Sequence, residues 1–116
     1  MIRTCSPEIP TFVSHSVPIP RCCPVSGNPA PGSSIRLSYK PLGVVFPVED
    51  LTSMVAEYVD GHADRDVRNM EEMIQDLAVR AATVTGVSVR VVADLRIDPP
   101  YGGDQQTMRV AARATA

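Results

Sequence analysis

Residues 87–98 read Val-Ser-Val-Arg-Val-Val-Ala-Asp-Leu-Arg-Ile-Asp, the most regular pattern in the chain. Apolar residues occupy the odd-numbered positions from 87 to 97, and polar residues occupy the even-numbered positions, except for Val92. Alternation with a period of two predicts a half-buried β-strand. Because antiparallel sheets commonly bury one face and expose the other, this strand predicts an antiparallel sheet covered on one face.

Weaker versions of the same pattern lie on both sides of this strand. Downstream, Met108, Val110 and Ala112 alternate with arginines after a turn-rich segment at 99–104, which predicts a last strand. Upstream, residues 35–39 alternate in the same way, and residues 44–46 form a short apolar run after the turn at 41–43. The sequence therefore predicts two strands before the central region and two after it.

Two helices are expected between these strand pairs. Apolar residues recur at helical spacing from Val48 to Tyr58 and again from 70 to 81, with a polar loop at 60–66 between them. Asn69, with Glu72 three residues later, resembles a helix cap, and Gly86 is suited to end the second helix. The resulting order, ββααββ, predicts an α+β two-layer sandwich with a four-stranded antiparallel sheet and both helices on one face.

Residues 1–32 differ from the rest because they hold seven of the eleven prolines. Proline fixes φ and lacks an N–H donor, so we expect an extended arm, with one possible edge segment at 12–17. The expected organisation is a proline-rich arm over 1–32 that carries a cysteine loop, followed by one domain over 33–116. The length of 116 residues fits this single domain.

Composition limits the functional classes. A net charge of −2 gives no electrostatic reason to expect tight nonspecific binding to nucleic acid. Three cysteines and no apolar leader segment predict reduced thiols and a cytoplasmic location. No apolar run approaches the roughly 18 residues of a membrane span, so no membrane association is expected.

The segment with the most evident chemistry is Cys22-Cys23-Pro24-Val25-Ser26-Gly27-Asn28-Pro29. A thiol on a constrained loop near backbone N–H groups is well placed to act as a nucleophile. Adjacent cysteines do not match the spacing of zinc ligands, and no second Cys/His pair follows, so no metal is expected.

This loop, with the ββααββ order behind it, resembles the tunnelling-fold (T-fold) proteins of the QueF group over about residues 20–114. The resemblance rests on the pattern Cys-Pro-x-Ser/Thr-Gly-x-Pro at 23–29, on Val48-Glu49 opening the first helix, and on Glu71 near the start of the second. The group includes nitrile reductases acting on 7-cyano-7-deazaguanine and QueF-like amidinotransferases acting on the same nitrile in nucleic acid. The resemblance also implies a ring-shaped homo-oligomer with sites between subunits.

The resemblance implies a covalent mechanism. Cys23 holds the position of the thiol that attacks the nitrile carbon to give a thioimide, which ammonia then converts to the formamidine of an archaeosine-type base. Glu71, with Glu72 as second candidate, corresponds to the carboxylate that reads the purine edge. Glu49 and Asn28 are further candidates for substrate binding.

Departures from the family pattern select among its activities. Leu51 and Met54 stand where the reductases carry lysines linked to NADPH, which favours an amidinotransferase that needs no cofactor beyond ammonia. Ala30 replaces the aspartate that serves as proton donor, so His62 or Asp66 from the 60–66 loop would have to supply the acid.

Alternatives remain open at this stage. They are an NADPH-dependent reductase giving 7-aminomethyl-7-deazaguanine and a non-catalytic deazapurine-binding protein, the second supported by Ala30. The sequence does not decide whether the substrate base is free, a nucleoside, or part of tRNA or DNA.

Overall fold

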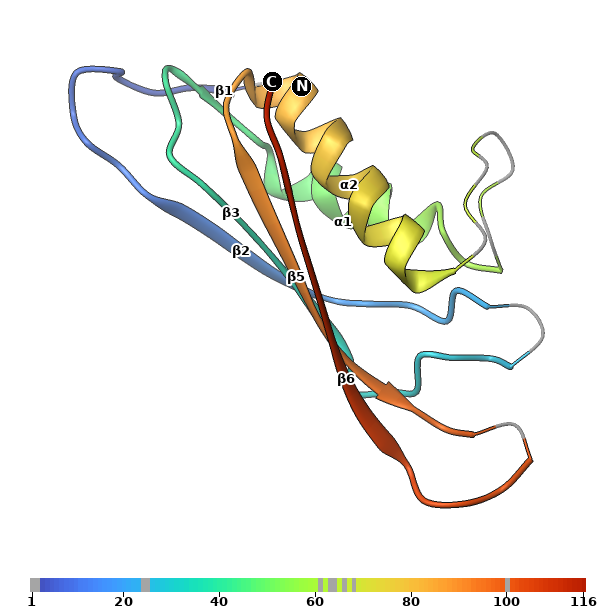
Figure 1. Cartoon of the computed structure of the whole chain (residues 1–116). Coiled ribbons are helices and arrows are strands. Elements are labelled where there is room, and N and C mark those ends of the chain that lie inside the picture. Colours follow the sequence, from blue (N-terminus) through green and yellow to red (C-terminus); the bar gives the residue numbers. More distant parts are fainter. Residues whose placement is uncertain are drawn as a thin grey trace.

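The computed structural model of the chain describes residues 3–23, 26–60, 62, 65, 67, 69–99 and 101–116. Its elements, in chain order, are β1 (Arg3–Thr4), β2 (Val13–Pro18), β3 (Ser34–Tyr39), β4 (Val44–Val45), α1 (Val48–Ala56), α2 (Met70–Thr85), β5 (Val89–Ile97) and β6 (Gln106–Ala114). Strands β2, β3, β5 and β6 form one antiparallel sheet in that spatial order, and Figure 1 shows α1 and α2 on the same side of it. The predicted α+β architecture is confirmed to this extent.

The sheet register explains the alternation in the sequence. Leu37 on β3 lies opposite Val91 on β5, which in turn lies opposite Ala112 on β6, so these side chains share one face. That face packs under the helices in a single core, and its β3 and β5 members are almost fully buried. The other face carries exposed arginines and serines and is covered by no helix or strand among the described residues.

Local signals fix the ends of α2. The Asn69 side chain accepts a 2.8 Å hydrogen bond from the backbone N–H of Glu72, which satisfies one of the free donors of the first turn. Gly86 ends the helix with φ of 73°, a left-handed conformation that glycine adopts at little cost. Both predicted helix boundaries are confirmed.

Two predictions about the sheet need correction or refinement. The run at 44–46 was expected to be the second strand of the main sheet, but β4 pairs instead with β1 in a separate two-stranded ribbon. Its place is taken by β2, from the proline-rich arm, which pairs with β3 along its whole length. An edge strand tolerates the flanking prolines because only one side must donate hydrogen bonds.

The molecule is elongated, measuring 53 × 27 × 22 Å, with a Cα radius of gyration of 14.9 Å. A compact chain of this length would have a radius near 13 Å. Figure 1 shows that β5 and β6 run past the helices toward the end of the sheet where the 19–33 loop also lies. Neither described helix has the length and apolar character needed to cross a membrane.

Candidate functional site

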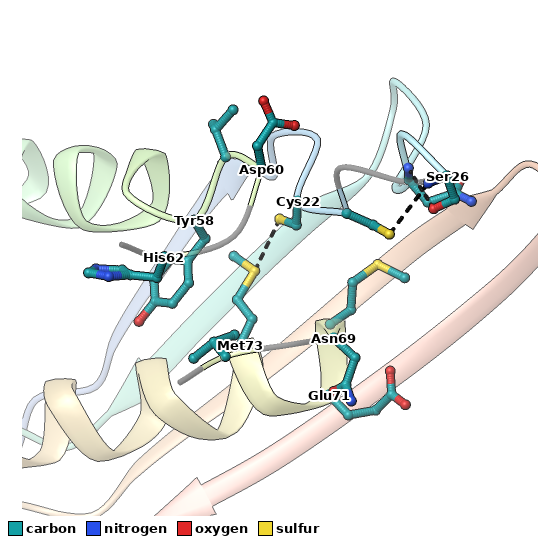
Figure 2. Close-up of a pocket in the computed structure, with 13 residues that line it drawn as sticks. Cys22, Ser26, Tyr58, Asp60, His62, Asn69, Glu71 and Met73 are labelled. Carbon is teal, nitrogen blue, oxygen red and sulfur yellow. Dashed lines mark hydrogen bonds between the residues drawn. The ribbon is translucent and has the colours of Figure 1, made fainter. Parts of the chain in front are cut away.

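A pocket of about 740 Å³ lies between the cysteine loop, the segment after α1 and the start of α2. Its size falls in the range of typical small-ligand sites. Figure 2 shows the loop residues Cys22 and Ser26 on one side and Asn69 and Glu71, at the beginning of α2, on the other. The lining residues are Cys22, Cys23, Ser26, Asn28, Tyr58, Val59, Asp60, His62, Val67, Asn69, Met70, Glu71 and Met73.

Asn28 fixes the cysteine loop to the end of β5. Its side-chain amide donates to the Asp98 carbonyl and its side-chain oxygen accepts from the Asp98 N–H, both at 2.8 Å. Its own carbonyl accepts from the N–H groups of Cys22 and Cys23, each at 3.0 Å. Asn28 is 5% exposed and lines the pocket, and its side-chain amide is engaged in holding the loop in position.

Cys23 is the half-buried thiol of the loop. The backbone N–H of Ser26 points at its sulfur from 3.5 Å, drawn in Figure 2 as the dashed line that ends near Ser26. The turn that creates this contact is closed by a 2.9 Å hydrogen bond from the Gly27 N–H to the Cys23 carbonyl, with Gly27 at φ of 73°. An N–H directed at sulfur stabilises negative charge there, which is what a thiolate nucleophile needs.

Cys22 has a different environment, although it lines the same pocket. Its thiol donates to the Pro20 carbonyl at 3.1 Å and contacts the Met73 sulfur at 3.3 Å. Burial, with a smaller contribution from the nearby Cys23 charge, raises the pKa of Cys22 to about 11. The thiol is therefore protonated near neutral pH and packs as part of the core.

Glu71 is exposed in the first turn of α2 and faces the pocket. Among the described residues its carboxylate has no hydrogen-bond or ion-pair partner. Glu72 differs, because its Oε1 accepts a 3.1 Å hydrogen bond from the Asn69 side chain and it does not line the pocket. Of the two predicted carboxylates, the structure therefore places Glu71 and not Glu72 where a ligand could reach it.

Of the remaining residues predicted from the sequence, one lines the pocket, one does not, and one cannot be placed. Glu49 lies in the first turn of α1, whereas the pocket is reached by the residues after that helix, so the structure does not bring Glu49 to this site. His62 does line the pocket. Asp66 lies outside the described residues.

His62 lies at the far end of the pocket from Ser26 in Figure 2. Its Nε2 is 3.4 Å from Glu57 Oε1, and its ring meets the Tyr58 ring edge-on with centroids 5.1 Å apart. Its side chain is only 7% exposed. These contacts hold His62 against the wall formed by the end of α1.

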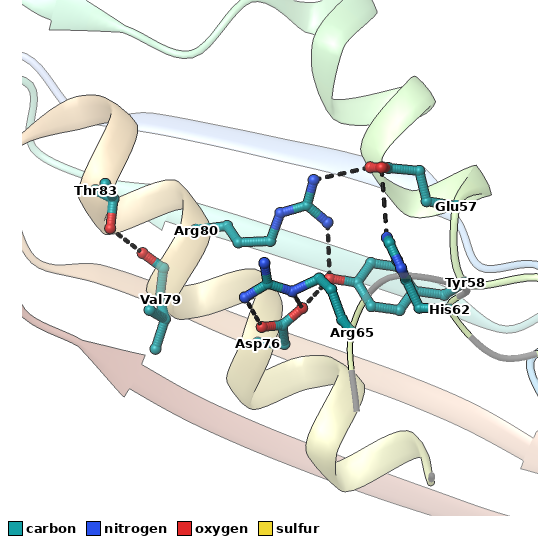
Figure 3. Close-up of polar contacts among 8 residues, drawn as sticks. All are labelled: Glu57, Tyr58, His62, Arg65, Asp76, Val79, Arg80 and Thr83. Atoms are coloured by element: carbon teal, nitrogen blue, oxygen red, sulfur yellow. Dashed lines mark hydrogen bonds and ion pairs between the residues drawn. The ribbon is translucent and has the colours of Figure 1, made fainter. Parts of the chain in front are cut away.

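A polar network behind the pocket joins the segment after α1 to α2 (Figure 3). The buried Tyr58 hydroxyl donates to Asp76 and accepts a 2.9 Å hydrogen bond from Arg80 Nη1, while Arg65 forms a two-pronged ion pair with Asp76. Burial and the hydrogen bond to Asp76 raise the pKa of Tyr58 to about 12. The network fixes Tyr58 as a rigid wall of the pocket.

Sequence reasoning missed several lining residues. Tyr58 was read only as part of a helical apolar stripe, and Asp60 only as part of a polar loop. Asp60 accepts a bidentate pair of hydrogen bonds from Arg21, at 3.1 and 3.0 Å, which ties the segment after α1 to the residue before the cysteine pair. No sequence spacing connects residues 21 and 60, so this contact could be found only from the fold.

Thirteen residues from three segments thus surround a space with the Cys23 thiol on one wall and the Glu71 carboxylate on another. Four of the lining residues, Val59, Val67, Met70 and Met73, are aliphatic or thioether side chains that suit a flat ring. Within the described residues no group of three or more His, Cys, Asp and Glu side chains is arranged to hold a metal ion. No protein-family model, no curated protein and no solved structure matches this chain.

Proposed function

We propose that this protein is a QueF-like amidinotransferase, which converts the nitrile of a 7-cyano-7-deazaguanine base in tRNA or DNA to a formamidine. The observation that supports it most is the shared pocket of Cys23 and Glu71, two residues that are 48 positions apart in the sequence and that the resemblance assigned to one site. A thiolate suits the electrophilic nitrile carbon, and a carboxylate can accept from the ring N–H and the exocyclic amine of a guanine-like edge.

The proposed reaction has two steps. The Cys23 sulfur adds to the nitrile carbon, the C–S bond forms, and the nitrogen takes up a proton to give a thioimide. Ammonia then adds to the same carbon, the C–S bond breaks, the thiol is regenerated and the formamidine is released. His62 is the candidate acid among the described lining residues, because Ala30 cannot protonate the nitrogen.

The positions after Glu49 support the amidinotransferase over the NADPH-dependent reductase. Leu51 is 99% buried and Met54 packs against the core. These helix positions therefore serve the fold of this chain and present no cation to a dinucleotide phosphate.

The proposal includes a ring-shaped homo-oligomer with sites between subunits. The described part of the sheet leaves the outer edges of β2 and β6 unpaired, and unpaired edges are natural places for strands of further copies. In such a ring Glu49, which lies away from the pocket of its own chain, would belong to the site of a neighbouring copy.

The test is the intact mass of the protein after mixing with 7-cyano-7-deazaguanine. We expect a gain equal to the whole base in the wild type and in Cys22→Ala, and no gain in Cys23→Ala. Addition of ammonia should remove the adduct and release the formamidine. If Cys23→Ala still consumes nitrile, the covalent mechanism is excluded.

A non-catalytic deazapurine-binding protein is the second candidate, because Ala30 is buried and its N–H is bonded to the Arg96 carbonyl at 2.7 Å. That candidate predicts reversible binding of the base with equal affinity in the wild type and Cys23→Ala. A calorimetric titration of both proteins distinguishes it from the enzyme.

A further inference from the structure

The pocket between the cysteine loop and α2 is lined by four sulfur-bearing side chains. Cys22 and Cys23 come from the loop, and Met70 and Met73 come from the beginning of α2. Residues three apart on a helix lie on the same face, so both methionines are presented to the loop. The chain has three cysteines and five methionines, so half of its sulfur-bearing residues line this one space.

One pair of these sulfur atoms is already in contact. Cys22 Sγ lies 3.3 Å from Met73 Sδ, drawn in Figure 2 as the dashed line between the two residues. Two sulfur ligands of one tetrahedral metal ion, each bound at about 2.3 Å, lie about 3.8 Å apart. The pair therefore needs to open by only about 0.5 Å to hold an ion. Methionine has three rotatable side-chain bonds, so its sulfur adjusts to such a change easily.

The surroundings of the four sulfur atoms suit a bound metal ion. The backbone N–H of Ser26 donates to the Cys23 sulfur from 3.5 Å, and hydrogen bonds to a coordinating sulfur stabilise its charge. Val59 and Val67 line the same space. An apolar shell limits the access of water to a metal site and favours ions that prefer sulfur over oxygen ligands.

We infer that this pocket binds a soft monovalent metal ion, Cu(I), with Cys22 and Met73 as the anchoring ligands and Cys23 and Met70 as the further sulfur ligands. Thiolate and thioether sulfurs are the ligands that select Cu(I). Zinc is bound by thiolate, imidazole and carboxylate groups, so a site built half from thioethers disfavours zinc. On binding, each coordinating thiol releases its proton to the solvent and its sulfur bonds to the metal, whose oxidation state does not change.

This site goes beyond the proposed function and does not depend on it. The nitrile chemistry uses the Cys23 sulfur and makes no use of Cys22, whereas the metal site needs Cys22. A bound ion and the nitrile would compete for Cys23, so the Cu(I)-loaded protein should form no adduct with 7-cyano-7-deazaguanine. Cys22 is therefore the residue that separates the two proposals.

The test is an anaerobic titration of the protein with Cu(I) alone, in competition with the Cu(I) chelator bathocuproine disulfonate. We expect one bound ion per chain in the wild type. Affinity should fall about 100-fold in Cys22→Ser and about tenfold in Met73→Leu, since even groups behind the ligands contribute roughly 10–100-fold. Both variants should stay folded, because a serine hydroxyl can still donate to the Pro20 carbonyl and a Met-to-Leu change conserves volume.

Two matched variants control for sulfur atoms outside the pocket. Cys5→Ser removes the cysteine of the N-terminal arm, and Met54→Leu removes a methionine that packs against the core from α1. Neither should change the affinity for Cu(I). X-ray absorption of the Cu(I)-loaded wild type gives a readout that needs no variant, and it should show only sulfur neighbours at about 2.3 Å.

Three results would overturn the inference: unchanged affinity in Cys22→Ser and Met73→Leu, nitrogen or oxygen neighbours in the absorption spectrum, or binding of Zn(II) as tight as that of Cu(I). A loss of affinity in Cys5→Ser equal to that in Cys22→Ser would also overturn it. The proposed function is tested separately by adding 7-cyano-7-deazaguanine to metal-free Cys22→Ser, which should form the adduct. A missing adduct, with Cu(I) binding intact in the wild type, would contradict the nitrile chemistry and leave the metal site in place.

Discussion

Cys22 and Cys23 are neighbours in the chain, yet their thiols have different surroundings. Cys22 is 8% exposed and donates to a carbonyl, whereas Cys23 is half-buried and accepts from the Ser26 N–H. Since only the thiolate reacts with alkylating agents, burial and the raised pKa of Cys22 should protect it.

We therefore predict selective alkylation. With iodoacetamide at pH 8, Cys23 should be modified well before Cys22, whose reactivity should rise only as the pH approaches 11. Peptide mapping by mass spectrometry after short exposures reads out each site separately. Equal rates at the two positions would show that the environments described for the two thiols do not hold in solution.

The adjacent glutamates of α2 allow a matched comparison. Both lie in the first turn, where the interaction of a carboxylate with the helix dipole stabilises the fold by about 0.3–1 kcal/mol. Glu71→Gln and Glu72→Gln should therefore lower the free energy of unfolding by similar amounts. Only Glu71 lines the pocket, and a hydrogen bond to a charged group contributes about 1.5–3 kcal/mol. We expect affinity for the deazapurine to fall at least tenfold in Glu71→Gln and to change little in Glu72→Gln.

Calorimetry with the Cys23→Ala background measures this affinity without the covalent step. A larger loss of affinity in Glu72→Gln than in Glu71→Gln would reverse the assignment of the two carboxylates.

The loop as an element depends on Asn28 more than on either cysteine. Asn28→Ala removes both hydrogen bonds to the Asp98 backbone, which lie in a partly buried position, and each such bond contributes about 0.5–1.5 kcal/mol. We expect a lower melting temperature together with loss of adduct formation, because Cys23 would no longer be held over the pocket. Ser26→Ala is the milder comparison, because it keeps the N–H that contacts Cys23 and loses only the 3.3 Å hydrogen bond that the Ser26 hydroxyl accepts from the Asn28 N–H. It should keep adduct formation and lower the melting temperature less than Asn28→Ala.

The contact of Asp76 on α2 with Tyr58 and Arg65, in the segment after α1, should make stability sensitive to acid. Burial by itself would raise the pKa of Asp76, but hydrogen bonds from Arg65 and Tyr58 outweigh it and lower the pKa. A carboxylate with a lowered folded-state pKa contributes its full stability above its unfolded value of about 3.9, and this contribution is lost as the pH falls through the folded-state pKa. We predict that the free energy of unfolding declines below about pH 4, and less steeply in Asp76→Asn.

Urea unfolding at pH 7 and pH 3 measures this difference. Tyr58→Phe provides the comparison, because it removes one hydrogen bond to Asp76 and keeps its ion pair with Arg65. If Asp76→Asn and the wild type lose the same stability between these pH values, Asp76 is not a source of the acid dependence.

At the element scale, sequence pattern predicted what depends on local chemistry. The alternation at 87–97, the Asn69 cap and the Gly86 end all follow from the backbone and its nearest side chains, and each is observed. The partner of β4 did not follow, because an apolar run of three residues, 44–46, contains nothing that distinguishes pairing with residues 3–4 from pairing with a main-sheet strand. The strand that takes its place is β2. It lies in the proline-rich arm, and for that reason the sequence predicted only an edge segment there.

In the candidate site, too, local features could be predicted from the sequence and long-range contacts could not. Cys23 and Glu71 could be named from the sequence because the loop pattern and the helix start are local features. The anchoring role of Asn28 and the pairing of Arg21 with Asp60 could not, because both are contacts across 39 or more residues. Glu49 was assigned to the site by resemblance, and in a single chain it lies elsewhere.

The position of Glu49 leads to a prediction about the whole assembly. If the pocket of one copy is completed by Glu49 of another, Glu49→Ala and Cys23→Ala should each be inactive, while a mixture should regain activity. Random exchange of subunits restores both groups in roughly a quarter of the sites of a 1:1 mixture, because each must come from a different chain. Nitrile consumption after mild dissociation and reassociation measures this recovery.

The matched control mixes the wild type with a chain carrying both substitutions. Here a site with two intact groups again needs two wild-type copies, so activity should fall below that of unmixed wild type at the same wild-type concentration. Full activity of Glu49→Ala alone would remove Glu49 from the site. If both single variants are inactive and their mixture is also inactive, Glu49 and Cys23 act within one chain. The structure argues against that outcome, because α1 alone places about 10 Å between Glu49 and the last turn of the helix, and the pocket begins after that turn.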